Sequence, residues 1–302
     1  MDKPVIEVDQ LYKSFNSVVA VDHLSFQVNR GEIFGLLGPN GAGKTTTIRI
    51  LMDIIKSDGG TVRVLGEPPG TARERIGYLP EERGLYRGLK VGETLVYLGQ
   101  LKGMSGAAAK KRAAELLARV DLTEWAKAKV QELSRGMQQK VQIIASIIHD
   151  PDLVILDEPF QGLDPVNVQV VKDLIGDLRA KGKTIALSAH EMSQVEALCE
   201  RILLIDHGKA VLYGDLAEIK KQFSPNAIEI TPALSFDGWV EVTRTEMRDH
   251  KQLIYLAKGV TPREFLKNAL DRGLPIEQFE MASVPLEQIF VQVVTGGNHE
   301  PA

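Results

Sequence analysis

The 302-residue sequence has one cysteine, no long apolar run and no excess of basic residues. Its single cysteine, Cys199, excludes a framework of intramolecular disulfides and is typical of a reducing compartment. A membrane-spanning helix needs about 20 consecutive apolar residues, and the sequence has no such run. The first residues also lack the apolar segment of a secretory signal. We therefore expect a soluble, intracellular protein.

Charge gives no indication of a nucleic-acid partner. The sequence has 36 lysine and arginine residues against 40 aspartate and glutamate residues, so its formal net charge is −4. Nucleic-acid binding favours a basic surface, and this composition does not predict one. Apolar residues make up 44% and charged residues 25% of the chain, which is typical of globular proteins. The length favours about two domains.

Apolar strands alternate with helical patterns over most of the chain. Residues 33–37, 153–156 and 184–187 are nearly continuous apolar runs, as in strands that are buried on both faces. Residues 166–178 and 191–199 have helical patterns. This alternation predicts an α/β fold with a mostly parallel sheet.

Strand patterns fade between about residue 88 and residue 148. Alanine, leucine, lysine and arginine dominate this segment, and apolar residues recur at the spacing of one helical face, as at Ala113, Leu116, Leu117 and Val120. We expect a helical insertion in the α/β unit.

A small α+β domain is predicted over residues 226–296, after a larger domain that ends near residue 220. Thr261-Pro262-Arg263-Glu264 has the form of a capping box with proline at the first helical position. The residues of this domain indicate no particular chemistry. Its predicted strands are residues 228–230, 239–243 and 253–257.

The clearest motif is Gly38-Pro39-Asn40-Gly41-Ala42-Gly43-Lys44-Thr45, which fits the pattern G-x-x-x-x-G-K-[ST]. It lies between a predicted strand and the helical pattern of residues 46–55, where a phosphate-binding loop belongs. Lys44 would reach the β- and γ-phosphates, and the Thr45 hydroxyl would bind Mg²⁺. A glycine-rich turn before a helix is the alternative. The residues expected to hold nucleotide are Gly38, Asn40, Gly41, Ala42, Gly43, Lys44, Thr45 and Thr46.

Two carboxylates, Asp157 and Glu158, follow the predicted strand at residues 153–156. Ligands of open α/β sheets bind at the carboxyl ends of the strands. Asp157 would hold Mg²⁺, and Glu158 would orient or deprotonate a water that attacks the γ-phosphorus. An ordinary polar strand end is the alternative, which the nearby phosphate loop makes less favourable.

Residues 4 to about 215 resemble the nucleotide-binding subunit of an ABC transporter, with the motifs in that family's order. The resemblance is carried by Leu133-Ser134-Arg135-Gly136-Met137-Gln138 for the signature loop, Asp157-Glu158 for Walker B, Gly162-Leu163-Asp164 for the D-loop, His190 for the switch histidine and Phe15 for the aromatic that stacks on adenine.

Two departures narrow this resemblance. Glu81 stands where the Q-loop of the family usually has glutamine, and Arg135 and Met137 replace residues that are common in the signature. With these residues at positions 81, 135 and 137, the chain resembles a subgroup of the family. This subgroup is the bacterial ABC-2-type exporter ATPases of the sodium- and drug-efflux type, which have an extra C-terminal domain.

The resemblance implies a P-loop NTPase domain over residues 1–220, with an antiparallel β subdomain and a helical insertion. It implies an ATPase that uses ATP and Mg²⁺. The residues that it marks are Lys44, Glu158 and His190 for catalysis, Phe15, Ser134, Gly136 and Asp164 for further nucleotide contacts, and Thr45, Asp157 and Glu81 for the metal.

The resemblance also implies partners. A second ABC ATPase subunit, identical or a paralogue, would close on ATP with its Ser134 and Gly136, and a separate transmembrane permease would carry the substrate. We expect the chain on the cytoplasmic, inner face of the cell membrane, without a nucleic-acid partner. The alternatives are a soluble ABC-type ATPase acting on ribosomes or nucleic acid, and a regulatory module whose C-terminal domain senses a ligand.

Overall fold

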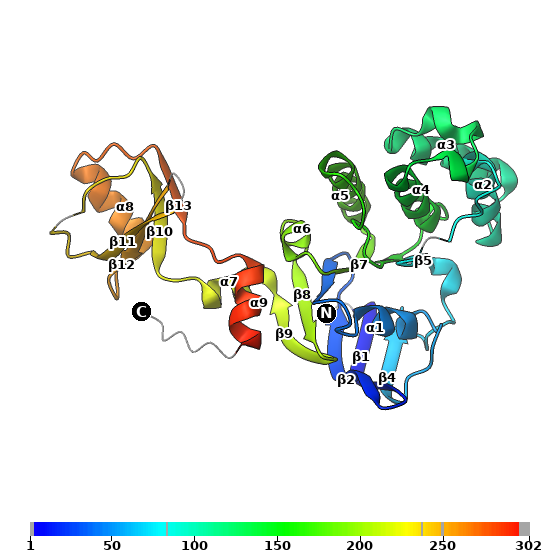
Figure 1. Ribbon diagram of the computed structural model, residues 1–302, viewed down its shortest axis with the longest axis horizontal. Helices are drawn as coiled ribbons and strands as arrows, with labels where there is room; N and C mark the ends of the chain where they lie inside the picture. The colour runs from blue at the N-terminus through cyan, green and yellow to red at the C-terminus, as the bar shows by residue number, and fades with distance from the viewer. Residues whose placement is uncertain (1–2, 83, 237, 249–250, 296–302) are drawn as a thin grey trace. The chain divides into compact units, whose positions relative to one another are not determined.

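The computed structural model describes residues 3–82, 84–236, 238–248 and 251–295 (Figure 1). The chain divides into two compact units, Met1–Leu216 and Ala217–Ala302. Within the described ranges, no helix is long and apolar enough to cross a bilayer.

A six-stranded sheet forms the centre of the first unit. Its neighbouring strands are parallel except for the antiparallel pair β8 and β9. Every residue of β3, β6 and β7 is buried, which explains their unbroken apolar runs and confirms the predicted parallel sheet. In order across the sheet, the strands are β5 (Ile76–Leu79), β6 (Leu153–Leu156), β7 (Thr184–Ala189), β3 (Ile33–Leu37), β8 (Arg201–Asp206) and β9 (Lys209–Asp215).

A three-stranded antiparallel sheet accompanies the central sheet, as the family resemblance implied. It has the order β2 (Val18–Val28), β1 (Ile6–Phe15) and β4 (Gly59–Val64). Its buried side chains join those of β3 in one hydrophobic core, where the rings of Phe26 and Phe34 stack with centroids 5.7 Å apart.

Helices follow the parallel strands (Figure 1). Helix α1 (Lys44–Leu51) follows β3, α5 (Pro165–Ala180) follows β6 and α6 (Met192–Glu196) follows β7. Helix α6 is shorter than the predicted helix over residues 191–199. After the helix, the Glu200 amide donates a hydrogen bond to Ile33 O of β3 at 3.0 Å, so the chain has joined the sheet by this residue.

The segment between β5 and β6 is helical, as predicted. It contains α2 (Val91–Leu101), α3 (Gly106–Arg119), two 3₁₀ turns (Thr123–Lys127 and Val130–Glu132) and α4 (Arg135–Ile147). Ser105 caps α3 by accepting a hydrogen bond from the Ala108 amide, and its buried face includes Ala113, Leu116 and Leu117.

The second unit is a four-stranded antiparallel sheet with helices, which confirms the α+β prediction. Its strand order is β11 (Val242–Arg248), β12 (Lys251–Leu256), β10 (Ala227–Thr231) and β13 (Gln278–Met281). Its helices are α7 (Leu216–Phe223), α8 (Pro262–Asp271) and α9 (Leu286–Val294). The predicted capping box starts α8: Thr261 accepts from the Glu264 amide, and Glu264 accepts from the Thr261 amide.

The strand predicted at residues 239–243 is misplaced, because β11 begins only at Val242. Trp239 instead packs against Phe236 and Phe265, with ring centroids 5.3 and 5.6 Å away. Strand β13 was not predicted, since most of its side chains are exposed and leave no apolar pattern.

Candidate nucleotide-binding and catalytic site

The predicted phosphate loop joins β3 to α1. Gly38 and Gly43 have φ angles of +147° and +107°, which residues with a Cβ rarely adopt. A Cβ at Gly38 would lie 2.1 Å from Ile205 O, and one at Gly43 would lie 2.3 Å from Ala20 O. Both positions therefore require glycine for conformation and for space.

The Lys44 ammonium is buried at the base of this loop. Its Nζ donates hydrogen bonds to Gly38 O at 2.8 Å and to Pro39 O at 3.2 Å. It also lies 3.4 Å from Oε1 of Glu158. The loop therefore places the Lys44 ammonium at the predicted phosphate site, within ion-pair distance of the Glu158 carboxylate that follows β6.

Asp157 is fully buried at the end of β6. Its Oδ1 accepts hydrogen bonds from Ser188 Oγ at 2.5 Å and from Thr45 Oγ1 at 3.3 Å. Its Oδ2 is also buried and has no hydrogen-bond partner within the described residues. Burial raises the pKa of Asp157, while the hydrogen bonds from Ser188 and Thr45 lower it. A buried carboxylate oxygen without a partner is suited to bind a cation.

The oxygen atoms around Thr45 fit Mg²⁺. Its hydroxyl lies 3.4 Å from Glu81 Oε2 and 3.3 Å from Asp157 Oδ1. Mg²⁺ prefers oxygen ligands and is commonly held by one or two carboxylates together with substrate phosphates. In the part of the chain that the structure describes, no group of three or more histidine, cysteine, aspartate or glutamate side chains is spaced to hold a metal. Phosphate oxygens would have to complete this site.

Glu158 lies between a cation and an imidazole. Its Oε2 is 2.9 Å from His190 Nδ1, and its Oε1 is the atom near Lys44. The Glu158 backbone has a φ of +51°, and its amide donates a hydrogen bond to Ser188 Oγ at 2.9 Å. These contacts orient the carboxylate, which could accept a proton from an adjacent water.

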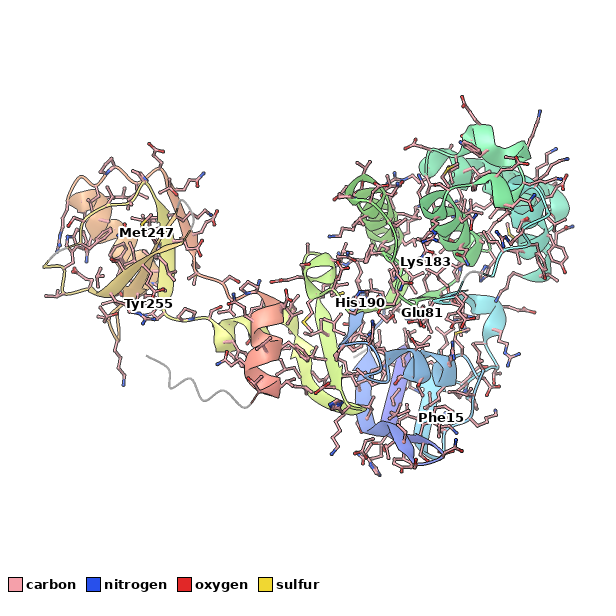
Figure 2. All side chains as sticks on the ribbon, in the orientation of Figure 1. Phe15, Glu81, Lys183, His190, Met247 and Tyr255 are labelled. Carbon is pink, nitrogen blue, oxygen red and sulfur yellow. The ribbon has the colours of Figure 1, made fainter. Side chains whose placement is uncertain are left out.

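Glu81 and His190 belong to this edge through the strands that precede them. Glu81 follows β5 and His190 follows β7, two of the parallel strands whose carboxyl ends lie on one side of the sheet (Figure 2). The structure thus brings together the phosphate loop, Asp157, Glu158, Glu81 and His190.

Sequence reasoning missed Ser188, which connects the two acidic residues. The Ser188 hydroxyl accepts from the amide of Glu158 and donates to the carboxylate of Asp157. It is fully buried at the end of β7. The signal available in the sequence was a polar residue at the end of an apolar strand, two positions before His190.

Ser134, Gly136 and Asp164 lie at two neighbouring helix starts. Ser134 caps α4 by accepting from the Met137 amide at 3.3 Å, and Asp164 caps α5 by accepting from the Asn167 amide at 2.9 Å. The hydrogen bonds from the backbone amide and the side-chain amide of Asn167 lower the pKa of Asp164. A Cβ at Gly136 would be 3.5 Å from Leu163 Cδ2. Within the described residues of one chain, none of the three forms a hydrogen bond or an ion pair with the cluster around Lys44.

Phe15 ends β1 and is 46% exposed. Lys13 Nζ lies 5.1 Å from the centroid of its ring and 2.8 Å from Asp58 Oδ1. The ring therefore has a cation near it and remains accessible for stacking.

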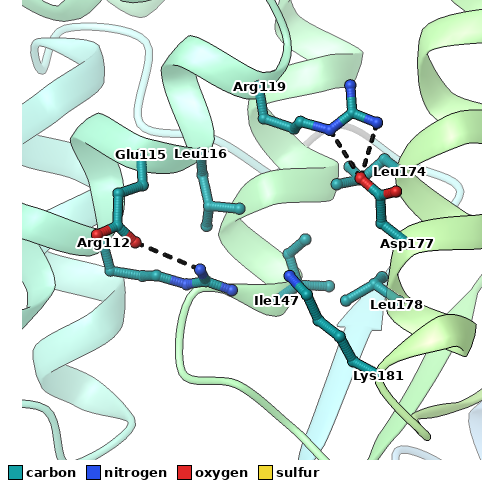
Figure 3. A pocket seen from close by; sticks show the side chains of 9 residues that line it. All are labelled: Arg112, Glu115, Leu116, Arg119, Ile147, Leu174, Asp177, Leu178 and Lys181. Atoms are coloured by element: carbon teal, nitrogen blue, oxygen red, sulfur yellow. Dashed lines mark hydrogen bonds and ion pairs between the residues drawn. The ribbon is translucent and has the colours of Figure 1, made fainter.

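A cavity of about 170 Å³ lies between α3, α4 and α5 (Figure 3). Its wall includes the ion pairs Arg119–Asp177 and Arg112–Glu115, with N···O distances of 2.7 and 3.5 Å. Partly exposed pairs of this kind contribute about 0–1 kcal/mol each. No predicted site residue lines this cavity, so it is separate from the edge described above.

The parallel sheet, the phosphate loop and the acidic strand end define a P-loop protein that binds nucleoside triphosphates. Residues 21–161 match the sequence model of the family "ABC transporter". Residues 214–294 match the model of the domain "ATP-binding protein DrrA1-3-like, C-terminal domain".

Known proteins that are similar to the chain are also ATP-binding proteins of transport or export systems. The uncharacterized ABC transporter ATP-binding protein YhaQ of Bacillus subtilis is 44% identical over 297 residues, which cover 96% of this chain and 98% of YhaQ. The Nod factor export ATP-binding protein I of Paraburkholderia xenovorans is 40% identical over 280 residues, or 90% of this chain and 92% of that protein. The solved structure of an ATP binding subunit of an ABC transporter superposes with a TM-score of 0.67 at 32% identity, covering 72% of this chain and 93% of that one.

The chain belongs to the ATP-binding subunits of ABC transporters, with a DrrA-like C-terminal domain. It is accordingly an ATPase that binds ATP, as the sequence predicted.

Proposed function

We propose that this subunit powers export through a separate membrane permease, and that it hydrolyses ATP as a dimer in which each nucleotide lies between two subunits. The observation that carries the proposal is the cluster of Lys44, Thr45, Asp157, Glu158 and His190 at one edge of the sheet. The export direction rests on the relative that is named for Nod factor export.

In this proposal, Lys44 and the backbone amides of the phosphate loop bind the phosphates. Thr45, Asp157 and Glu81 would hold Mg²⁺, which when bound neutralises charge that develops on the phosphates. Glu158 accepts a proton from the attacking water, while His190 and Lys44 keep its carboxylate in place. Phe15 supplies a stacking surface for the adenine.

Ser134, Gly136 and Asp164 have a place in this mechanism only if a second subunit is present. They lie at the starts of α4 and α5, where backbone amides favour an anion, and in their own chain they do not join the cluster around Lys44. We infer that they contact the nucleotide held by the other subunit. ATP would then favour dimers, and hydrolysis would release them.

The variant Glu158→Gln tests the chemical part of the proposal. The amide cannot accept a proton, so ATP hydrolysis should fall by at least about 100-fold. Nucleotide affinity should stay within about threefold because the phosphate-binding residues are intact, and ATP-bound dimers should accumulate in size-exclusion chromatography.

Glu191→Gln is the matched control. Glu191 also approaches His190, with Oε1 3.7 Å from Nε2, but its side chain is 56% exposed. This variant should keep turnover and remain monomeric after hydrolysis. Wild-type turnover in purified Glu158→Gln protein would remove Glu158 from the mechanism.

The permease is tested in membranes. Tagged Glu158→Gln protein should co-purify from detergent extracts with a protein that has several membrane spans, and reconstitution with that protein should raise the ATPase rate of the wild type. If the captured membrane protein did not change the ATPase rate of the wild type, the transport part of the proposal would be wrong.

A further inference from the structure

The turn between β8 and β9 is hydrogen-bonded to the backbone of the phosphate loop at Ala42. The amide of Gly208 in this turn donates a hydrogen bond to Ala42 O at 3.0 Å. The Gly208 carbonyl in turn accepts from the Asp22 amide of β2 at 2.9 Å. One glycine therefore joins the phosphate loop to a strand of the other sheet.

Three stretches of backbone meet here without room for side chains. A Cβ at Gly43 would lie 2.3 Å from Ala20 O, and Gly208 Cα is only 3.7 Å from that same position. Gly208 itself has a φ of +78°, and a Cβ there would lie 3.1 Å from Ala20 O and 3.3 Å from the Asp22 nitrogen. A side chain at residue 208 would therefore push the turn away from β2 and from the loop.

The bond to Ala42 O fixes the direction of the next amide. In a planar trans peptide the carbonyl and the N–H point in opposite directions. Because the carbonyl of the Ala42–Gly43 peptide points to Gly208, the Gly43 N–H points away from the turn. On its other side, Gly43 O accepts from the Thr47 amide and from Thr47 Oγ1, both at 2.9 Å. Gly43 is thus held by hydrogen bonds on both flanks.

We propose that Gly208 is a positioning residue for nucleotide binding, which acts by holding the Gly43 amide in the direction that a phosphate oxygen requires. This inference rests on the proposed function of the phosphate loop. The group that it serves is the phosphate chain shared by ATP and ADP. Within the described residues, no hydrogen bond or ion pair joins Glu158 or His190 to the turn, so the rate of hydrolysis at saturating ATP should not depend on it.

The test compares Gly208→Ala with Gly66→Ala. Gly66 has nearly the same backbone conformation, with a φ of +80°, but a Cβ there would meet nothing within 4 Å. Both substitutions introduce similar backbone strain, so both should lower the melting temperature, and Gly208→Ala should lower it further because its Cβ also crowds Ala20. Only Gly208→Ala should weaken Mg-ADP binding in isothermal titration calorimetry, by about tenfold if about one hydrogen bond is lost.

The kinetic signature separates positioning from general damage. In Gly208→Ala, the KM for ATP should rise in parallel with the Kd for ADP while kcat stays within about twofold. Gly208→Asn is the second variant, because asparagine tolerates positive φ and should keep the turn folded while its Cβ still crowds Ala20.

ADP affinities within twofold of wild type in both Gly208 variants would overturn the inference. An equal loss of affinity in Gly66→Ala would also overturn it. Lys44→Ala distinguishes these results from a failure of the proposed function. If Lys44→Ala abolishes ADP binding while the Gly208 variants bind normally, the phosphate loop stands and only the role of Gly208 is wrong.

Discussion

Replacing Asp157 by asparagine should stabilise the nucleotide-free protein and at the same time remove its response to Mg²⁺. The carboxylate is fully buried, and Oδ2 has no partner within the described residues. Asparagine keeps an oxygen that can accept from Ser188, and the NH₂ group in the place of Oδ2 is still buried but carries no charge. Leaving a buried polar group unsatisfied costs about 1–3 kcal/mol, and more when it is charged. We expect a gain of about 1–2 kcal/mol, or about 2–6 °C in melting temperature.

The pH dependence of this difference follows from the direction of the pKa shift. Burial raises the pKa of Asp157 in the folded state, so folding favours the protonated carboxyl. The protonated Asp157 carboxyl contributes its full share to the free energy of unfolding below the unfolded-state pKa of about 4. This contribution is lost as the pH rises through the folded-state pKa. The advantage of Asp157→Asn should therefore be largest near neutral pH and should shrink in acid.

Thermal unfolding in EDTA between pH 5 and pH 8 measures this difference. Asp152→Asn is the control, because Asp152 precedes the same strand at its other end, is partly exposed and forms a surface ion pair with Arg75. Saturating Mg-ADP should reverse the order, since a ligand at 100 times its Kd adds about 2.7 kcal/mol to the wild type and less to the variant. If Asp157→Asn were no more stable than wild type in EDTA at pH 8, the carboxylate would not be an energetic cost in the empty site.

Two further predictions concern residues away from the site. Cys199 is buried, and burial raises its pKa to about 12. At pH 8 an aromatic disulfide reagent should therefore label Cys199 at least about 100-fold more slowly in the native protein than in urea-unfolded protein. Equal labelling rates would contradict this burial. Phe265→Ala should cost the second unit about 3–5 kcal/mol, because this fully buried ring contacts Phe236 and Trp239. In a Trp125→Phe background, Trp239 fluorescence should report the loss while ADP affinity is unchanged, and coupled loss of both would refute an independent accessory domain at residues 226–296.

The sequence predicted the structure correctly where consecutive residues determine it. The strand at residues 33–37, the phosphate loop and the start of α1 are consecutive, so periodicity and the glycine pattern could locate all three. The same holds for α8, whose first turn is fixed by Thr261 and Glu264. Asp157 could also be placed, because a polar residue that follows a buried strand must lie at the edge of the sheet.

Contacts between distant segments could not be predicted in this way. Ser188 joins the two carboxylates only because β6 and β7 are neighbours in the sheet. Beyond the end of α6, the Glu200 amide bonds to Ile33 O of β3. Strand β13 owes its place to pairing with β10 rather than to its own exposed side chains. In each case the decisive partner lies more than 20 residues away.

In the proposed function, the charges at the edge of the sheet favour the magnesium complex of ATP over metal-free ATP as the substrate. Glu81, Asp157 and Glu158 contribute three carboxylates around Thr45 and Lys44. Lys44 already shares its charge between Glu158 and two loop carbonyls, so it cannot by itself offset both these groups and a triphosphate. A metal-free triphosphate would add negative charge beside Oδ2 of Asp157, which has no hydrogen-bond partner within the described residues. In the proposed function, Thr45, Asp157 and Glu81 would hold Mg²⁺, whose positive charge would offset this repulsion. A glutamate at residue 81 would then be compatible with nucleotide binding.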